Sequence, residues 1–494
     1  MILVIDLGSS STRAMLYDEP VGAVPAAMAR EPFAFAVAED GRCEDDAGAA
    51  FARVLKVLDA LHDAAGQRRL GDITHLAISA YASSLVGLNE AGNPITPVYT
   101  YADTRCADDA RNLRAQCDEM DALRRTGCRI RANYLPARIA WLRRTQPDAF
   151  AQTRWFASLS DFVMLRLFGR MRAGISIASW TGLLNRATSD WDATWIETLG
   201  ISKMQLPPLS PSGQGQGVGD LLPEWQSRWP LFKGVACQPP VGDGAAANIG
   251  SGCVDPSRIA VTIGSTAAMR VVSAHGADPA SVMNPALWSY RVDHDHDLIG
   301  GATTEGGNVM AWARSMLRVP DAGALEAAIA LMRPDAHGLT VLPTFAGERS
   351  PGYAEDIRAT LHGLSLDTSP VEITRALMEG IAMRLATICD ALRESSVAAR
   401  DAVLAASGGA LQASPAWCQI IADAAGMPLA VADVPEATSR GAALLAIDAW
   451  RLNDSLRVDL HALIYQPNPQ HHSIYRAAMA RQQELYAKLV RSDR

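Results

Sequence analysis

The first residues that could do chemistry lie close to the N-terminus. The apolar run Ile2–Leu7 contains Asp6 and leads directly into a turn of small and hydroxyl residues. Glycine lets a ligand approach the backbone, and backbone N–H and hydroxyl groups can donate hydrogen bonds to phosphate oxygens. Asp6 could hold Mg²⁺, directly or through water, while an arginine could offset phosphate charge. The sequence predicts either a phosphate grip or an ordinary hairpin over Gly8, Ser9, Ser10, Ser11, Thr12 and Arg13.

A second candidate acid, Asp243, lies among glycines and alanines near the middle of the chain. Its surroundings, Val241–Gly250, have the sequence VGDGAAANIG. Because Asp243 precedes an alanine-rich helical segment, one interpretation is a helix N-cap. The other is a general base held beside glycines that let a substrate come close. This segment alone favours the cap, and the two roles are compatible with each other.

The N-terminal turn has a counterpart in the second half of the chain. The apolar strand and turn of Leu3–Ser10 (LVIDLGSS) are echoed by Ile259–Thr266 (IAVTIGST), and each is followed by another apolar strand. This repeat predicts two related domains that open with the same hairpin. Facing hairpins of this kind suit a bound nucleotide. The turn of the second copy consists of Gly264, Ser265 and Thr266.

A glycine pair, Gly408 and Gly409, follows the apolar run Ala402–Ala406 and precedes a helix that opens with Ser414. A strand followed by two glycines and a helix suits a nucleoside that lies against the backbone. Many other α/β loops have the same pattern, so the pair alone does not decide its role.

The elements that must position these residues alternate between strand-like and helical patterns, which is typical of an α/β fold. Apolar residues at helical spacing between Phe51 and Leu61 predict one helix, and Pro136 is placed to begin another. The Pro-, Gly- and Ser-rich segment 206–223 predicts a loop. Strands are expected over 2–7, 13–17 and 73–79, and further helices over 371–392, 417–425 and 474–490.

Composition bounds the remaining possibilities. A chain of 494 residues exceeds the size of one hydrophobic core, and 49% hydrophobic residues argue against long disorder. A net charge of −8 argues against non-specific nucleic-acid binding. No apolar run approaches the ~18 residues of a membrane span, and the N-terminus lacks the features of a signal peptide.

Cysteine and lysine usage excludes several known sites. The eight cysteines form no C-x-x-C pair, so reduced thiols in the cytoplasm are expected rather than disulfides or a zinc site. The segment His294–His296 alternates like metal ligands, but its short acidic setting favours an exposed turn or strand edge. None of the four lysines stands in a P-loop or a protein-kinase strand, and no G-x-G-x-x-G is present.

With these pieces in order, the chain resembles the FGGY family of carbohydrate kinases nearly from end to end. The resemblance implies an α/β fold with two actin-like (ribonuclease H-like) ATPase domains flanking a central cleft. The expected domains are 1–245, for sugar binding and the catalytic base, and 246–494, for the nucleotide. The similar segments include DLGSSSTR at 6–13, YLPARIAWL at 134–142, SIASWTGLLNRATSDWD at 176–192, VGDGAAANIGSG at 241–252, TIGSTAAMRV at 262–271, SGGALQASPAWCQIIAD at 407–423 and ATSRGAALLA at 437–446.

The resemblance also implies roles. Asp243 would accept the proton of the attacking sugar hydroxyl and Asp6 would lie near Mg²⁺. The two hairpin turns would hold the phosphates of ATP, with Gly408 and Gly409 along the nucleoside. Phosphoryl transfer needs such positioning and charge neutralisation more than covalent chemistry. The positions where family members touch substrate are Ser83, Tyr101, Asp103 and Tyr134.

One departure affects the substrate. Where many xylulose and gluconate kinases carry Met-His, this chain has Ala82 and Ser83, and Tyr101 replaces a usual Trp. The stretches GERSP at 347–351 and EGGN at 305–308 look closest to the gluconate branch. Gluconate is therefore the first expectation, and xylulose or another pentulose or polyol is the alternative. No nucleic-acid or membrane partner is expected, and a homodimer is compatible with the sequence.

Two rival classes share the fold. One is a non-catalytic sugar- or nucleotide-sensing protein, which the presence of both Asp6 and Asp243 disfavours. The other is an actin- or chaperone-type ATPase, which should hydrolyse ATP without any sugar. Fold alone does not choose among them.

Overall fold

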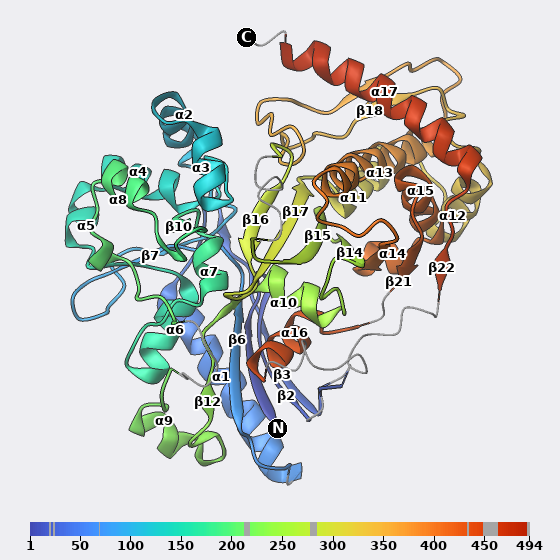
Figure 1. Cartoon of the computed structure of the whole chain (residues 1–494). Helices are drawn as coiled ribbons and strands as arrows, with labels where there is room; N and C mark the ends of the chain where they lie inside the picture. Colours follow the sequence, from blue (N-terminus) through green and yellow to red (C-terminus); the bar gives the residue numbers. More distant parts are fainter. Residues whose placement is uncertain are drawn as a thin grey trace. The chain divides into compact units, whose positions relative to one another are not determined.

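The structure, a computed structural model, describes residues 1–18, 21–22, 25–68, 70–211, 218–276, 284–431, 434–447 and 463–491. The chain forms two compact units (Figure 1). The first unit comprises Met1–Gly252, Ser289–Leu298 and Val434–Arg457. The second unit comprises Cys253–Trp288, Ile299–Asp433 and Val458–Arg494.

A mixed sheet forms the centre of the first unit. Its strands run in the order β12 (Ala236–Cys237), β6 (His75–Ala80), β1 (Ile2–Leu7), β2 (Ser11–Tyr17) and β3 (Ala27–Pro32), and β13 (Val241–Gly242) also pairs with β6. β1 and β13 both run parallel to β6, whereas β1 and β2 are antiparallel. Every residue of β1 is buried, which explains its unbroken apolar run apart from Asp6. The helix α1 (Ala47–Arg68) packs its buried face, including Val54, Leu58 and Leu61, into the core of this sheet.

A second, largely helical core belongs to the same unit. In this core the helix over Leu135–Thr145 packs against short neighbouring helices and strands through buried residues such as Ile139, Trp141, Leu184 and Trp195. Further helices of this unit are α2 (Ala107–Gln116), α3 (Glu119–Thr126), α4 (Leu135–Thr145), α5 (Pro147–Gln152), α6 (Leu159–Phe168), α7 (Ile175–Ser179), α8 (Ala193–Leu199), η1 (Lys203–Gln205), α9 (Pro223–Arg228) and η2 (Pro230–Phe232). Of these, α6, α9 and η2 pack into the sheet core instead. The short strands are β4 (Ala36–Val37), β5 (Cys43–Asp45), β7 (Val86–Leu88), β8 (Val98–Tyr99), β9 (Trp155–Ala157), β10 (Leu184–Asn185) and β11 (Asp190–Trp191).

Two glycine-bearing helices pack closely in the first unit. They are α10 (Asp243–Gly250) and α16 (Ala437–Ala446), and α16 also contacts β1 and β6. A Cβ added at Gly441 would overlap the carbonyl oxygen of Ala246, and one at Gly250 would overlap that of Ala437. Both positions therefore require glycine, because any side chain would force the two backbones apart. The guanidinium of Arg440 adds a hydrogen bond from Nη1 to the carbonyl oxygen of Gly250, 2.6 Å away.

The sheet of the second unit repeats the arrangement of the first. Its strands run in the order β16 (Trp288–Arg291), β17 (His296–Thr303), β15 (Ala267–Ala274), β14 (Arg258–Ile263), β20 (Val403–Ser407), β21 (Leu429–Val431) and β22 (Ile464–Tyr465). β14 forms an antiparallel hairpin with β15 and pairs in parallel with β20, as β1 does with β2 and β6. The predicted repeat of the hairpin is therefore confirmed.

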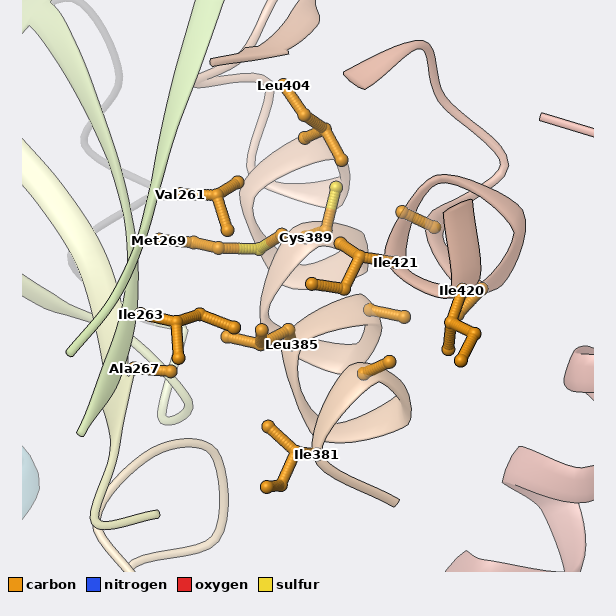
Figure 2. Packing of buried hydrophobic residues seen from close by; sticks show 14 of the residues in the cluster. Val261, Ile263, Ala267, Met269, Ile381, Leu385, Cys389, Leu404, Ile420 and Ile421 are labelled. Atoms are coloured by element: carbon orange, nitrogen blue, oxygen red, sulfur yellow. The ribbon is translucent and has the colours of Figure 1, made fainter. Parts of the chain in front are cut away.

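The core of the second unit lies between this sheet and the long helix α13 (Pro370–Glu394). Figure 2 shows Val261, Ile263 and Met269 of the sheet packed toward Ile381 and Leu385 of that helix. α15 (Pro415–Ala425) covers the other side of α13, through residues such as Ile421. The remaining elements are β18 (Thr340–Leu342), β19 (Thr360–His362), α11 (Gly307–Met316), α12 (Ala322–Leu331), α14 (Gly409–Gln412) and α17 (Pro469–Arg491).

Most local sequence predictions are confirmed. The strands expected over 2–7, 13–17 and 73–79 correspond to β1, β2 and β6, and the long helices to α1, α13, α15 and α17. Part of the predicted loop 206–223, residues 212–217, lies outside the described residues. All eight cysteines are free thiols, as the sequence predicts. Within the part of the chain that the structure describes, no helix is both long and apolar enough to cross a membrane.

Candidate active site

The carboxyl ends of three parallel strands bring two acidic residues to one edge of the first sheet. In the pairing register, Asp6 of β1 lies opposite Ser79 of β6, and Val241 of β13 lies opposite the same Ser79 on its other side. Asp243 follows β13 directly as the first residue of α10. The fold therefore places Asp6 and Asp243 at the same edge, on either side of β6.

Asp6 is buried and held by two polar neighbours. Ser79 Oγ donates a hydrogen bond to Oδ1 over 2.9 Å, and Arg13 Nη2 lies 2.9 Å from Oδ2. Burial raises the pKa of Asp6, while Arg13 and Ser79 act in the opposite direction. Arg13 also donates from Nη1 to Glu436, at 2.7 Å, so its charge is shared between two carboxylates.

The turn beside Asp6 contains buried polar atoms suited to an anion or a metal. Gly8 N donates to Ser11 O over 3.1 Å, and Ser9 and Ser10 are exposed at the tip. Ser11 Oγ is buried and has no hydrogen-bond partner among the described residues. Asp6 Oδ2 is likewise buried, with its ion pair to Arg13 but no hydrogen bond within the described chain. These two oxygens fit the ligand chemistry of Mg²⁺ and its coordinated phosphate.

Asp243 does not act as the N-cap of α10, so that interpretation is wrong. The N-cap is Gly242, and Asp243 is the first helical residue, where its Oδ1 accepts a hydrogen bond from Gly244 N over 2.7 Å. The backbone of Gly242 is held by α7, because the Gly242 N–H donates a hydrogen bond to Ser176 Oγ over 3.2 Å. A Cβ at Gly242 would lie 3.0 Å from the indole nitrogen of Trp180, so glycine allows this indole to pack against β13, the strand that directly precedes Asp243.

Trp180 joins Asp243 to the residues expected to touch the substrate. Ser83, in the left-handed region with a φ of 58°, donates from Oγ to the carbonyl oxygen of Trp180 over 2.5 Å. The indole of Trp180 stacks on Tyr290, with ring centroids 3.8 Å apart. The hydroxyls of Tyr134 and Tyr290 are hydrogen bonded. Arg138 Nη1 donates to Ser83 O over 2.6 Å and so fixes the Ser83 backbone. Ser83, Tyr134 and β13, which leads to Asp243, thus form one cluster around Trp180.

The other two expected substrate residues lie on a neighbouring loop after β8. Tyr101 is 42% exposed, and its ring meets the edge of Tyr81 at a centroid distance of 6.2 Å. Asp103 is buried and accepts hydrogen bonds from Cys43 N, at 3.1 Å, and from the guanidinium of Arg105. Asp103 therefore anchors the loop that presents Tyr101.

In the second unit, the turn of the β14–β15 hairpin contacts a glycine pair that the sequence analysis did not assign to the site. Gly264, Ser265 and Thr266 are exposed. Gly307 N donates to Gly264 O over 2.7 Å, and a Cβ on Gly306 would lie 2.7 Å from the carbonyl carbon of Thr266. Asn308 N also donates to Ser265 O over 3.2 Å, so residues 306–308 support this turn.

Gly408 and Gly409 reach the same edge of the second sheet. β14 and β20 are parallel, with Thr262 opposite Ser407, so the segments that follow both strands lie side by side. Gly408 has a φ of +100°, and a Cβ there would lie 2.6 Å from Ile263 O. Gly409 has open space around its Cα, with no atom within 4 Å of an added Cβ. The second unit thus groups the glycines expected to contact the phosphates and the nucleoside.

Sequence reasoning missed Trp180, Tyr290 and the segment Gly306–Asn308. Trp180 stands in a segment quoted for the family resemblance, so that segment was the available signal. Tyr290 had none, because it reaches Trp180 only through the tertiary fold. His294 and Asp295 lie in the turn before β17, and His296 is the first residue of that strand, with its Nδ1 3.0 Å from Asp293 Oδ1.

Comparison with known proteins places the chain in a family. The N-terminal domain model of the FGGY family of carbohydrate kinases matches residues 1–250, and the C-terminal domain model matches residues 260–450. A gluconokinase of Bacillus subtilis is 24% identical over 92% of this chain and 88% of its own. A glycerol kinase of Polaromonas is 28% identical, covering 90% of each chain. The crystal structure of gluconate kinase from Lactobacillus acidophilus superposes with a TM-score of 0.87 at 24% identity, over 99% of this chain and 98% of that one.

The two domain models together cover most of the sequence, and the structural match gives the fold as the two-domain actin-like ATPase fold. The resemblance inferred from the sequence is confirmed. The chain belongs to the FGGY family of carbohydrate kinases, enzymes that use ATP to phosphorylate a hydroxyl of a sugar, sugar acid or polyol.

Proposed function

We propose that this kinase phosphorylates gluconate, with Asp243 as the general base. The observation that supports the base is the placement of Asp6 and Asp243 after neighbouring parallel strands, on either side of β6. One carboxylate would then serve the metal–phosphate side and the other the acceptor hydroxyl. The gluconokinase relative supports the choice of substrate.

Asp243 would accept the proton of the sugar hydroxyl as that oxygen attacks the γ-phosphate. Its position suits this role because its carboxylate is half-buried at a helix start, and the glycines on both sides leave room for a substrate. Ser83 and Tyr134 would orient the sugar, and Trp180 and Tyr290 would form an aromatic wall of the same pocket. Tyr101 and Asp103 remain proposed substrate residues, with Asp103 holding the loop.

Asp6 and Ser11 would hold Mg²⁺ and its phosphate, since both present buried oxygens with unfilled hydrogen-bonding capacity among the described residues. When bound, Mg²⁺ neutralises charge that develops on the transferred phosphoryl group. The turns Gly8–Arg13 and Gly264–Thr266 would donate to the phosphates of ATP. Gly408 and Gly409 would let the nucleoside lie against the backbone. We keep the division inferred from the sequence, with sugar binding and the base in residues 1–245 and the nucleotide in 246–494, except that Tyr290 would join the sugar pocket. The predicted location remains the cytoplasm, in accord with eight free cysteines.

The test is an ADP-release assay across gluconate, xylulose and glycerol, on wild type and Asp243→Asn. We expect gluconate to give the highest kcat/KM, and Asp243→Asn to lower kcat by about 10²–10⁴ without lowering the Tm. Asp356→Asn, an exposed carboxylate of the second unit, is the matched control and should keep full activity.

The outcomes separate the two parts of the proposal. Wild-type kcat in Asp243→Asn would show that another group is the base. Turnover of glycerol or xylulose in place of gluconate would refute the substrate while leaving the base intact. The polyol alternative is supported by the glycerol kinase relative.

A further inference from the structure

A small cavity lies in the second unit, lined by Thr303, Thr304 and Glu305, the residues that precede Gly306. It has a volume of about 10 Å³, close to the space that one water-sized particle needs. Thr304 and Glu305 approach it from the end of β17, Thr344 from the segment after β18, and Arg384 from α13. The mechanism proposed above uses none of these side chains.

The charges around the cavity do not balance. Glu348 forms an ion pair with Arg384, and Tyr486 donates a hydrogen bond to its Oε2 over 2.5 Å. This pair is neutral overall. Glu305 is buried, and its Oε1 accepts from Ala346 N over 3.0 Å, but no basic side chain of the described residues lies within 4 Å of it. The cavity is thus lined by two carboxylates and one guanidinium, and one negative charge is left over when Glu305 is ionised, although Arg384 offsets it in part.

Two hydroxyl groups at the cavity lack partners. Thr344 is 2% exposed, and its Oγ1 is buried without a hydrogen-bond partner among the described residues. Thr304 Oγ1 is also buried and also has no hydrogen-bond partner among the described residues. Buried polar oxygens are costly when they stay unsatisfied, so two of them beside a buried carboxylate indicate a missing partner. Burial raises the pKa of Glu305 to about 7, while backbone hydrogen bonds and the charge of Arg384 act in the opposite direction, so Glu305 is largely ionised only above this pH.

We propose that this cavity binds one alkali-metal cation, K⁺ or Na⁺, through the carboxylate of Glu305 and the hydroxyls of Thr304 and Thr344. A single positive charge balances the one carboxylate that the Glu348–Arg384 pair leaves uncompensated. Mg²⁺ is disfavoured, because it keeps several waters and the cavity has room for about one particle. Ca²⁺ is disfavoured by charge, because its two positive charges exceed the single carboxylate left without an ion pair.

The cation would order the loop behind the hairpin turn. Thr303 Oγ1 donates to Glu305 O over 2.6 Å, and the next residue, Gly306, lies against Thr266. A cation on Glu305 would therefore fix the segment that supports Gly264–Thr266. The effect on nucleotide binding rests on the proposed function, whereas cation binding itself does not.

The test is thermal unfolding of the full-length protein, without nucleotide or sugar, in potassium, sodium or tetramethylammonium chloride at equal ionic strength. At pH 8, where Glu305 is ionised, a cation concentration of about ten times Kd should stabilise the folded state by about 1.4 kcal/mol, which raises the Tm of a chain of this length by roughly 1–2 °C over tetramethylammonium. Thr344→Val keeps the shape of the side chain but removes the hydroxyl, and Glu305→Gln removes the charge. Both should lose the cation-dependent rise.

Thr374→Val is the matched control, since Thr374 is as buried as Thr344 but lies on α13 and donates to Pro370 O. It should keep the full cation-dependent rise. Crystals of the wild type soaked in Tl⁺, an analogue of K⁺, should show an anomalous peak beside Glu305.

Equal Tm values of the wild type in all three salts would overturn the proposal. So would a Thr344→Val protein that keeps the full rise, or a cavity that holds only a water in the Tl⁺ crystals. None of these measurements depends on turnover. A negative result would therefore refute the cation site without bearing on the proposed kinase mechanism.

Discussion

The glycine contact between α10 and α16 allows a quantitative prediction for Gly441→Ala. An added Cβ would overlap the carbonyl oxygen of Ala246 and lie 2.7 Å from the amide nitrogen of Gly250. Both obstacles are backbone atoms, so no side-chain rotation can relieve the overlap, and one helix must shift. That shift would also strain the hydrogen bond from Arg440 to Gly250.

Two effects of opposite sign decide the result. Alanine improves helix propensity over glycine by about 1 kcal/mol. Overpacking by a methyl group costs about 1–3 kcal/mol in a well-packed core, and the upper end applies when backbone is the neighbour. We therefore expect Gly441→Ala to lower the free energy of unfolding by about 2 kcal/mol. Because α10 begins at Asp243, a shift of about 1 Å should also cut kcat by about 10²-fold.

Urea unfolding followed by tryptophan fluorescence measures the first effect, and ADP release measures the second. Gly66→Ala in α1 is the matched control, because the nearest atom to its added Cβ is Leu231 Cδ1 at 3.9 Å. It should stabilise the protein by about 0.5–1 kcal/mol. A Gly441→Ala midpoint at or above that of the wild type would refute the close contact between the helices.

Three further predictions concern single side chains. Burial raises the pKa of Asp161 to about 6 from 3.8, so the folded state holds this proton more tightly and stability falls as the pH rises from about 4 to 6. Asp161→Asn should remove that fall, about 3 kcal/mol, in denaturation curves measured across this range. Ser83→Ala and Tyr101→Phe should each lower kcat/KM for the sugar about ten- to a hundredfold and leave the KM for ATP unchanged. A kcat/KM for the sugar equal to that of the wild type would contradict their place in the pocket. Gly408→Ala, strained at a φ of +100°, should raise the KM for ATP about tenfold in initial-rate assays, while an unchanged KM would remove Gly408 from the nucleotide site.

The sequence predicted the parts of the fold that depend on neighbouring residues. The β1–β2 and β14–β15 hairpins follow from apolar runs that end in glycine and hydroxyl residues, and each run contains its own signal. The helix α13 follows from an apolar face at helical spacing over more than twenty residues. The predicted N-cap at Asp243 was wrong, because the helix begins one residue earlier than that interpretation required and Gly242 takes the cap position.

The rest depends on contacts between distant segments. Tyr290 meets Trp180 only because the tip of the β16–β17 hairpin belongs to the first unit. The role of Gly306 and Gly307 depends on the contact between their backbone and the turn at Gly264. Local periodicity carries no information about such pairs, so their roles could be seen only in the structure.

The return of α16 to the first unit has a consequence for biosynthesis. Glu436, which contacts Arg13, and Gly441, which packs against α10, are synthesised late, after most of the second unit. Domains generally fold as units while the chain emerges from the ribosome, the N-terminal one first. Here the nascent N-terminal unit stays incomplete, with α10 uncovered and Arg13 lacking one carboxylate. A chain that stops before α16 would therefore lack both the helix that packs against α10 and the second carboxylate that Arg13 contacts.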